Sequence, residues 1–182
     1  YLRHGEPYIE PQVCQMLSRA NCKNMLRFYE TFEDETFHYI VTEFVNGSDL
    51  QEYMASLANK PRDEDVAKPI FKSVATALQE LHARNIIHRD VKPSNVLIDY
   101  KRGKQVFMLA DFGAAAKLAS PDDKATVRIG SLGYLSPELI QKQPYGCVSD
   151  IFSLGALLHY LFTGKAPFEH ANKQEHLDRV CS

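Results

Sequence analysis

The stretch that decides the fold is HRDVKPSN at residues 88–95, followed by ADFG at residues 110–113. Asp90, Lys92 and Asn95 bring an acceptor, a cation and an amide into one loop, directly before a strand-like run. Asp111 ends the next strand-like run and lies close to a glycine, which permits a sharp turn of the chain. The two segments therefore predict a cluster of polar side chains at the ends of neighbouring strands.

The residue types in this cluster indicate a chemistry. Asn95 and Asp111 supply oxygen atoms, the ligands that a hard cation such as Mg²⁺ prefers. The carboxylate of Asp90 and the ammonium of Lys92 then remain to orient a hydroxyl and a phosphate. Phosphoryl transfer asks a protein mainly for positioning and charge neutralisation. The pattern therefore favours phosphoryl transfer.

The rest of the chain predicts a small β-rich part followed by a larger helical part. Two aromatic and β-branched runs flank the polar turn EDET, which is typical of a hairpin. Apolar residues recur at helical spacing over residues 63–84. Residues 149–163 are apolar on most sides, which predicts a buried helix. The predicted helices span residues 11–19, 50–57, 63–84 and 149–163, the predicted strands span residues 26–32, 37–45, 95–99 and 106–110, and residues 111–135 are expected to be irregular.

Composition limits the classes of partner. The 182 residues fit one domain, 45% of them are hydrophobic, and the net charge is -2, which gives no nucleic-acid footprint. No apolar run reaches the roughly 18 residues that span a bilayer. The four cysteines lie far apart, which favours a reduced setting, cytoplasmic or nuclear. We therefore expect no nucleic-acid and no membrane partner. Because the chain opens without Met and ends inside a helical pattern, we also expect a piece of a longer protein.

The order and spacing of HRDVKPSN, ADFG and GSLGYLSPE (residues 130–138) make the chain resemble the eukaryotic protein kinase family, Ser/Thr type, over nearly its whole length. The resemblance implies an α+β, two-lobed fold with a mostly helical C-lobe. Residues 1–182 would form a partial kinase domain, with 1–45 as a remnant of the N-lobe and hinge and 46–182 as an incomplete C-lobe. The implied activity transfers the γ-phosphate of ATP to Ser/Thr hydroxyls of a protein substrate, with ATP and Mg²⁺ as cofactors.

The resemblance also implies roles for the residues of the decisive stretch. Asp90 matches the catalytic residue that accepts or orients the proton of the substrate hydroxyl, and Lys92 matches the residue that contacts the γ-phosphate. Asn95 and Asp111 match the two Mg²⁺ ligands. Arg89 precedes the catalytic Asp, which in the family often accompanies control by phosphorylation of the activation segment, here residues 111–138.

A nucleotide-binding hinge is implied by the strand that ends at residues 42–45. Thr42 would be the gatekeeper, and the backbones of Glu43 and Val45 would bond to adenine. Asp49 falls where the family places a polar residue near the ribose, and Leu97 would form the apolar floor below the base.

Further matches concern the framework around the loop. His88 and Phe112, with Leu17 and Phe28, match an apolar column that links the lobes. Asp150 matches the buried helix residue that holds the backbone of the catalytic loop.

In the activation segment, Gly113 belongs to the Asp-Phe-Gly turn, Ser131 to the loop that receives substrate, and Glu138 to the motif that closes the segment. Thr126 is a candidate for a regulatory phosphate that pairs with Arg89, although the register places Val127 at the commonest site.

Two features depart from the family pattern. The chain has no glycine-rich loop and no strand with the ATP-binding Lys, so residues 1–182 alone are expected to be inactive. Val13 stands where the helix Glu that pairs with this Lys is expected, and Glu10 lies one turn earlier. Three possibilities stay open: the register slips, Glu10 substitutes, or the kinase is impaired.

Two other classes compete with an active protein kinase. A pseudokinase scaffold that binds nucleotide or protein partners is favoured by Val13 but does not need Asp90, Lys92, Asn95 or Asp111. Small-molecule phosphotransferases of related fold would not be expected to carry Lys92-Pro93 or the stretch at residues 130–138.

Overall fold

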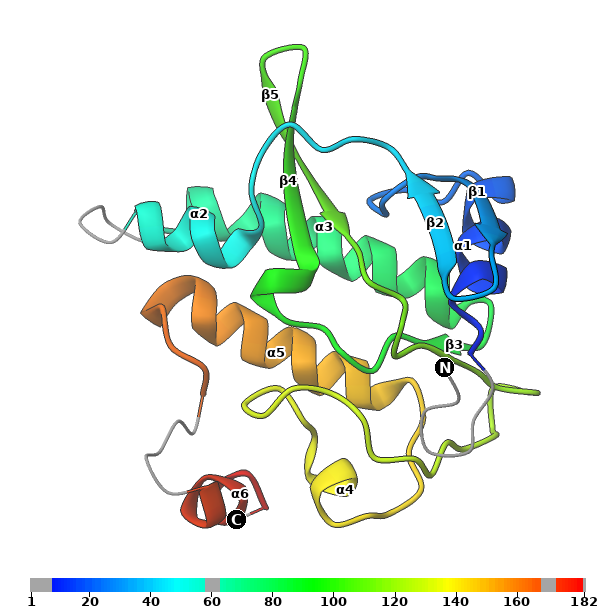
Figure 1. Ribbon diagram of the computed structural model, residues 1–182. Coiled ribbons are helices and arrows are strands. Elements are labelled where there is room, and N and C mark those ends of the chain that lie inside the picture. The colour runs from blue at the N-terminus through cyan, green and yellow to red at the C-terminus, as the bar shows by residue number, and fades with distance from the viewer. Residues whose placement is uncertain (1–7, 58–62, 168–172, 182) are drawn as a thin grey trace.

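A computed structural model describes residues 8–57, 63–167 and 173–181. Figure 1 shows a β-rich N-terminal part at the upper right and a helical part below it. The described strands form three separate two-stranded antiparallel sheets. This mixture of helices and open sheets is consistent with the α+β class predicted from sequence.

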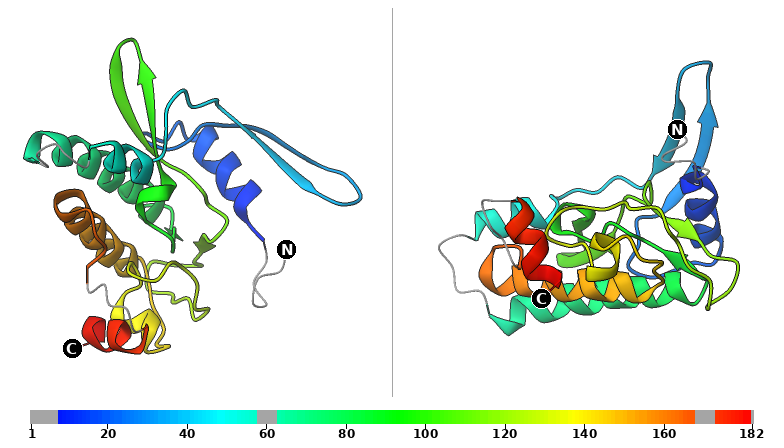
Figure 2. Two further views of the ribbon diagram at one scale, coloured as in Figure 1. Left: turned by 60° about the vertical axis from the view of Figure 1, so that its left-hand side comes forward. Right: turned by 90° about the horizontal axis from the view of Figure 1, so that it is seen from below.

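The N-terminal part consists of helix α1 (Glu10–Arg19) and the hairpin of β1 (Phe28–Glu33) and β2 (His38–Thr42). Pro11 lies in the first turn of α1, where its missing N–H has no partner to lose. The turn of the hairpin is closed by Asp34, whose Oδ1 accepts the N–H groups of Thr36 and Phe37 at 2.7 and 2.8 Å. Figure 2 shows that this hairpin projects away from the helical part.

The segment after β2 turns sharply before helix α2 (Leu50–Ser56). A Cβ on Gly47 would lie 2.0 Å from the carbonyl oxygen of Ile98, so only glycine fits this crossing. Ser48 O then accepts the Ile98 N–H at 2.9 Å. The predicted strand 37–45 is too long at its end, because β2 ends at Thr42 and the chain contacts β4 from Asn46 onward, where the Asn46 N–H donates to Oδ1 of Asp99 at 3.1 Å.

Two long helices form the centre of the helical part. Helix α3 (Glu64–His82) begins at Asp63, whose side chain accepts the Val66 N–H at 3.2 Å, and buries the apolar stripe predicted for it. Helix α5 (Val148–Thr163) packs beside α3, as the right-hand view in Figure 2, seen from below, shows. Two short helices, α4 (Pro137–Ile140) and α6 (Lys173–Cys181), lie at the opposite end from the hairpins (Figure 1).

A second hairpin carries the polar loop. Strand β4 (Val96–Lys101) pairs with β5 (Lys104–Leu109) through a two-residue turn in which Arg102 and Gly103 both have positive φ, 53° and 75°. Such turns match the twist of the paired strands. The 3₁₀ turn η1 (Pro93–Asn95) leads into β4.

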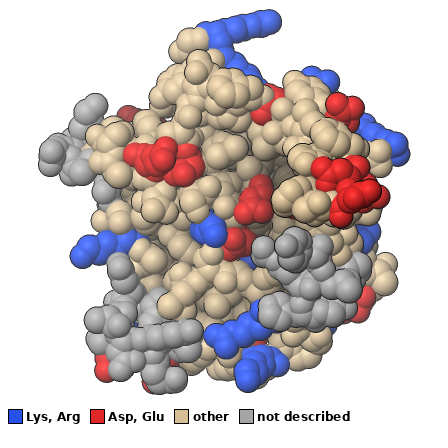
Figure 3. Space-filling view, in the orientation of Figure 1, with Lys and Arg blue, Asp and Glu red and all other residues tan. Residues whose placement is uncertain are grey.

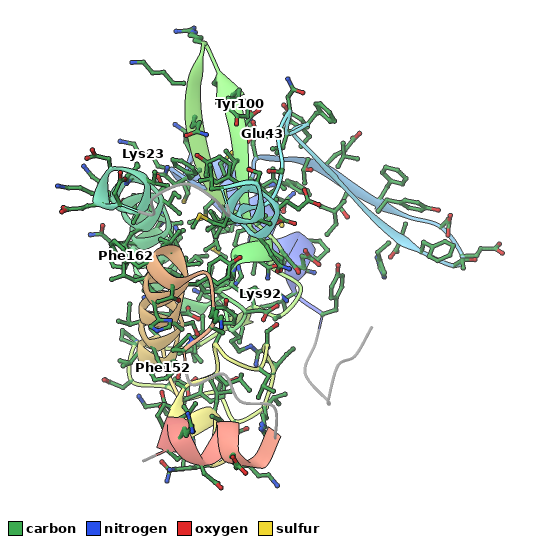
Figure 4. The ribbon with its side chains drawn as sticks, turned by 90° about the vertical axis from the view of Figure 1, so that its left-hand side faces the viewer. Lys23, Glu43, Lys92, Tyr100, Phe152 and Phe162 are labelled. Atoms are coloured by element: carbon green, nitrogen blue, oxygen red, sulfur yellow. The ribbon has the colours of Figure 1, made fainter. Side chains whose placement is uncertain are left out.

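Two sequence predictions about regular structure were wrong in part. Residues 111–135 include a short strand, β6 (Ala116–Lys117), which pairs with β3 (Ile86–Ile87). Helix α5 is not buried all round: Ile151 is 50% and Phe162 45% exposed, because its packing against α3 covers one side only. Figure 4 shows Phe152 and Phe162 along this helix.

Candidate active site

The loop at residues 88–95 is fixed by a buried carboxylate from helix α5. Asp150 is 1% exposed, and its two oxygens accept the backbone N–H groups of His88 and Arg89, each at 2.9 Å. Its Oδ2 also lies 2.8 Å from Nε2 of His82 on α3. Arg89 has a φ of 69°, an unfavourable conformation for a residue with a side chain. The hydrogen bonds of Asp150 therefore hold a strained turn directly before Asp90.

Asp90 is held through one of its carboxylate oxygens. Oδ2 lies 2.8 Å from Nζ of Lys92 and accepts Nδ2 of Asn95 at 3.1 Å. Nδ2 of Asn95 also donates to the Asp90 carbonyl at 2.8 Å. Oδ1 of Asp90 is buried and has no hydrogen-bond partner among the described residues. One oxygen is thus fixed, while the other is a buried acceptor that makes no hydrogen bond in the described structure.

The charge state of Asp90 follows from this arrangement. Burial acts to raise the pKa of its carboxyl, but hydrogen bonds and the positive charge of Lys92 outweigh burial and hold the pKa below its ordinary value. Asp90 is therefore ionised at neutral pH, as an acceptor for a hydroxyl proton must be.

Lys92 connects Asp90 to the activation segment. Its Nζ donates to Oγ of Ser131 at 2.8 Å while contacting Asp90. Figure 4 shows Lys92 between the strands of the upper part and the helices of the lower part. The ammonium group of Lys92 therefore contacts both the loop at residues 88–95 and Ser131, which the sequence predicts to lie in the loop that receives substrate.

The Asp-Phe-Gly turn lies against the same loop. Asp111 has a φ of 62°, and its Oδ1 accepts the Gly113 N–H at 3.2 Å. Phe112 is buried with its ring edge-on to His88, 5.4 Å between centroids. Leu17 and Phe28 are buried in the same core, so the four residues of the predicted column share one apolar cluster or contact it.

A cavity of about 690 Å³ opens beside these residues. Asp90, Asp111 and Gly113 line it from the helical part, and Tyr8 and Glu10 line it from the N-terminal part. Figure 3 shows acidic side chains in a hollow near the middle of this face. A cleft with carboxylates on its wall is suited to a cation and the phosphates that the cation neutralises.

The donor set fits Mg²⁺. Asp111 presents a carboxylate to the cavity. Because the NH₂ group of Asn95 faces Asp90, the amide oxygen of Asn95 is left for another partner. Within the described residues, no group of three His, Cys, Asp or Glu side chains could enclose a metal by itself. Such a sparse protein set suits Mg²⁺, which keeps several waters and substrate phosphates as ligands.

The residues predicted to hold the nucleotide base are not among those that line the cavity. The Glu43 N–H donates to Arg27 O at 2.8 Å, and Glu43 Oε2 lies 2.6 Å from Nζ of Lys101. Asp49 caps α2 by accepting the Glu52 N–H at 2.9 Å. Thr42 ends strand β2, Val45 follows it, and Leu97 lies on β4 opposite Asp49. These positions lie where the N-terminal part joins the helical part, and none of them is among the residues that line the 690 Å³ cavity.

The side-chain hydrogen bonds described here for Arg89 go to residues other than Thr126. Nε of Arg89 donates to Ala114 O, Nη2 donates to Ala115 O at 3.3 Å, and Nη1 donates to the Tyr145 hydroxyl at 3.3 Å. The side chain of Thr126 is exposed. The pairing of a Thr126 phosphate with Arg89 remains a prediction.

Glu138 is tied to helix α5. Its Oε1 accepts Oγ of Ser149 at 2.6 Å. Burial acts to raise the pKa of Glu138, but the bond from Ser149 and a backbone N–H bring the pKa below its ordinary value. The end of the activation segment is thus anchored to the helix that holds the catalytic loop.

The structure distinguishes between the two candidate acidic positions on α1. Val13 is buried in the core, and its apolar side chain cannot form an ion pair. Glu10 lines the cavity, and its Oε2 lies 3.3 Å from where a Cβ on Gly113 would be. Tyr8 donates to the same oxygen at 2.7 Å. Of these two positions, only Glu10 therefore faces the Asp-Phe-Gly turn.

Sequence reasoning missed several residues that shape the site. Tyr145 contacts Arg89, Lys101 joins Glu43 to Asp99, and Ser149 binds Glu138. Ser149 directly precedes the matched Asp150, whereas Tyr145 and Lys101 lie in no matched motif. Each of the three acts through a single polar atom, and the sequence gives no signal for the partner of that atom.

Comparison with known proteins places the chain in a family. The model of the protein kinase domain family matches residues 10–182. The chain is 34% identical over 169 residues to the serine/threonine-protein kinase PLK4 of Drosophila yakuba, covering 93% of this chain and 22% of that kinase. It is 38% identical over 157 residues to the serine/threonine-protein kinase ATG1a of Arabidopsis thaliana, covering 86% of this chain and 25% of that protein.

This chain belongs to the protein kinase domain family. It spans 22% and 25% of the length of these two relatives. Across the described ranges, no helix is both long enough and apolar enough to span a bilayer.

Proposed function

We propose that the protein of which this chain is part is a serine/threonine kinase that transfers the γ-phosphate of ATP to protein hydroxyls. The observation that carries the proposal is Oδ1 of Asp90, a buried and unpartnered acceptor on a carboxylate whose other oxygen is fixed by Lys92. The similarity to serine/threonine kinases over most of the chain supports the same assignment.

In this mechanism Asp90 orients the substrate. The hydroxyl of the target residue donates to Oδ1 of Asp90, which keeps an oxygen lone pair aimed at the γ-phosphorus. Lys92 neutralises charge on the transferred group, and its bond to Ser131 keeps it at the junction of loop and segment. The chain thus contributes orientation and charge, which is the main demand of phosphoryl transfer.

Asn95 and Asp111 would hold Mg²⁺, which supplies charge neutralisation at the phosphates when bound. Thr42, Glu43, Val45, Asp49 and Leu97 stay as predicted contacts of the nucleoside. Lys101 joins two segments near these residues, since its Nζ lies 2.6 Å from Oε2 of Glu43 and 3.4 Å from Oδ2 of Asp99.

Glu10 takes the place of the missing helix carboxylate in this proposal. Its side chain lines the cavity, with Oε2 3.3 Å from where a Cβ on Gly113 would be, and would face a cation bound there. The second candidate, a pseudokinase scaffold, is favoured by a single observation, the apolar Val13 at the usual acidic position.

Turnover by the full-length protein separates the two candidates. The protein is incubated with γ-labelled ATP and three matched peptides that differ only in Ser, Thr or Tyr at the target position. We expect label on the Ser and Thr peptides, none on the Tyr peptide, and complete loss on removal of Mg²⁺ with EDTA. A folded protein that binds ATP but labels no peptide would support the scaffold instead.

A further inference from the structure

The hydroxyl of Tyr145 joins two segments that lie far apart in the sequence. It donates to the carbonyl oxygen of Val127 at 2.6 Å, and it accepts from Nη1 of Arg89 at 3.3 Å. A phenol has one proton to donate and lone pairs to accept, so both bonds form at once. One neutral group therefore connects the catalytic loop with the activation segment.

The position of this hydroxyl is set by contacts that do not involve it. Tyr145 is 2% exposed, and its backbone pairs with Ala125 in both directions, at 2.9 and 3.0 Å. Its ring packs in the second apolar cluster of the molecule, with Ile87, Leu118, Ala125, Leu135 and Leu139. Because the ring is already fixed, little additional ordering of the side chain is needed to form the two polar bonds.

Arg89 completes the connection at the other end of the segment. Its Nε and Nη2 donate to the carbonyls of Ala114 and Ala115, directly after the Asp-Phe-Gly turn. Its own backbone N–H is held by Asp150. The start of the segment and residue 127 are thus both tied to the residue that precedes Asp90.

Phosphorylation commonly orders such a segment by giving an arginine a charged partner. In this chain the carbonyl of Val127 is reached by a tyrosine hydroxyl, and the neighbouring Thr126 side chain is exposed. We propose that Tyr145 takes the place of an activating phosphate, holding the activation segment so that the kinase works without phosphorylation there. This inference rests on the function proposed above.

The first test uses the full-length wild-type protein before and after phosphatase treatment, with phosphate loss at residues 111–138 checked by mass spectrometry. We expect kcat to change by less than about twofold, since the hydroxyl bonds of Tyr145 do not depend on a phosphate. A loss of tenfold or more, on the order of what a missing activating interaction costs, would overturn the proposal.

The second test removes the hydroxyl alone with Tyr145→Phe, and Tyr100→Phe at the exposed end of a hairpin is the matched control. We expect kcat to fall by about tenfold or more, with the Kd of ATP within about twofold, because orientation of the segment is lost while the cleft persists. Hydrogen exchange of the amides at residues 118–130 should accelerate in Tyr145→Phe only. Exchange and kcat equal to those of wild type would contradict the inference.

Hydrogen exchange separates this inference from the proposed function. If wild type and Tyr100→Phe transfer no phosphate, the proposed function fails, but faster exchange in Tyr145→Phe still reports the tether. If Tyr145→Phe does not fold, the phosphatase comparison decides. That comparison uses kcat before and after phosphatase treatment. Where the protein shows no turnover, it uses the hydrogen-exchange rates of the activation segment instead. In either case we expect phosphatase treatment to leave the measured value unchanged.

Discussion

Nζ of Lys92 lies 2.8 Å from Oδ2 of Asp90 and leaves Oδ1 of that carboxylate as a buried, unpartnered acceptor within the described structure. Val91 lies between the two residues in the sequence, and its side chain is buried in the core. The side chains of Asp90 and Lys92 contact each other beside it. Because Oδ2 is fixed, Oδ1 is the oxygen of Asp90 to which we propose that a substrate hydroxyl donates.

Replacing Lys92 by Met tests the cation in this pair. Lys92→Met keeps the length of the side chain but loses the contacts with Asp90 and Ser131. In the full-length protein we expect kcat to fall by about 10²-fold, as when one charge-stabilising donor is removed from an active site. Steady-state kinetics check the result, with Lys104→Met at an exposed hairpin position as the control. An unchanged kcat would remove Lys92 from the mechanism.

The pH dependence of kcat tests the charge state of Asp90. The folded protein lowers the pKa of this carboxyl, so the ionised form persists down to below the ordinary value of about 3.9. We expect no loss of kcat from Asp90 between about pH 5 and 8 in wild type. In Lys92→Met the hydrogen bond and the positive charge of Lys92 no longer lower the pKa of Asp90, so the pKa should rise and the acid limb should move toward this range. A wild-type limb near pH 6 to 7 that Lys92→Met leaves in place would argue against the assignment.

The buried carboxylate of Asp150 is tested with Asp150→Asn. The amide has one acceptor oxygen, so one of the two backbone N–H groups at His88 and Arg89 loses its partner. We expect the free energy of unfolding to fall by about 1–3 kcal/mol, given the cost of a buried unpaired donor. Chemical denaturation measures the change, and Asp122→Asn on the exposed segment should be neutral. Equal stability of both variants would contradict this role of Asp150.

Glu10→Gln tests whether Glu10 supplies the carboxylate that Val13 cannot. If Glu10 is the acidic partner near the phosphates, Glu10→Gln should lower kcat/KM for ATP by about tenfold, with little change in stability. Steady-state kinetics at varied ATP concentration measure the change, and Glu30→Gln on the exposed face of strand β1 is the control. An unchanged kcat/KM in Glu10→Gln would instead favour a register slip or an impaired kinase.

Much of the fold was predictable because it depends on local patterns. The apolar period of α3 and the Asp63 cap place that helix within two residues of its predicted ends. The turn at Arg102 and Gly103 needs positive φ at both positions, which favours the glycine present there. Motif spacing likewise identified Asp90, Lys92 and Asn95, whose contacts follow from one short loop.

Features that depend on long-range packing were not predictable. Strand β6 has two residues, too few for any period, and exists only because β3 lies beside it. Glu10 lines the cavity and Val13 is buried in the core. Which of the two faces the cavity depends on the rotation of α1 about its own axis. The bonds of Tyr145 span 18 and 56 residues, and a single tyrosine carries no signal of such partners.

The measurement that bears most directly on the central claim compares Asp90→Asn with wild type in the full-length protein. Asn keeps the shape of the side chain and loses the negative charge that aligns the hydroxyl. We expect kcat to fall by at least about 10²-fold while the Kd of ATP stays within about threefold, since the role proposed for Asp90 is to contact the hydroxyl and not the nucleotide. Wild-type kcat in Asp90→Asn, with Mg²⁺ present and the protein folded, is the result that contradicts the assignment.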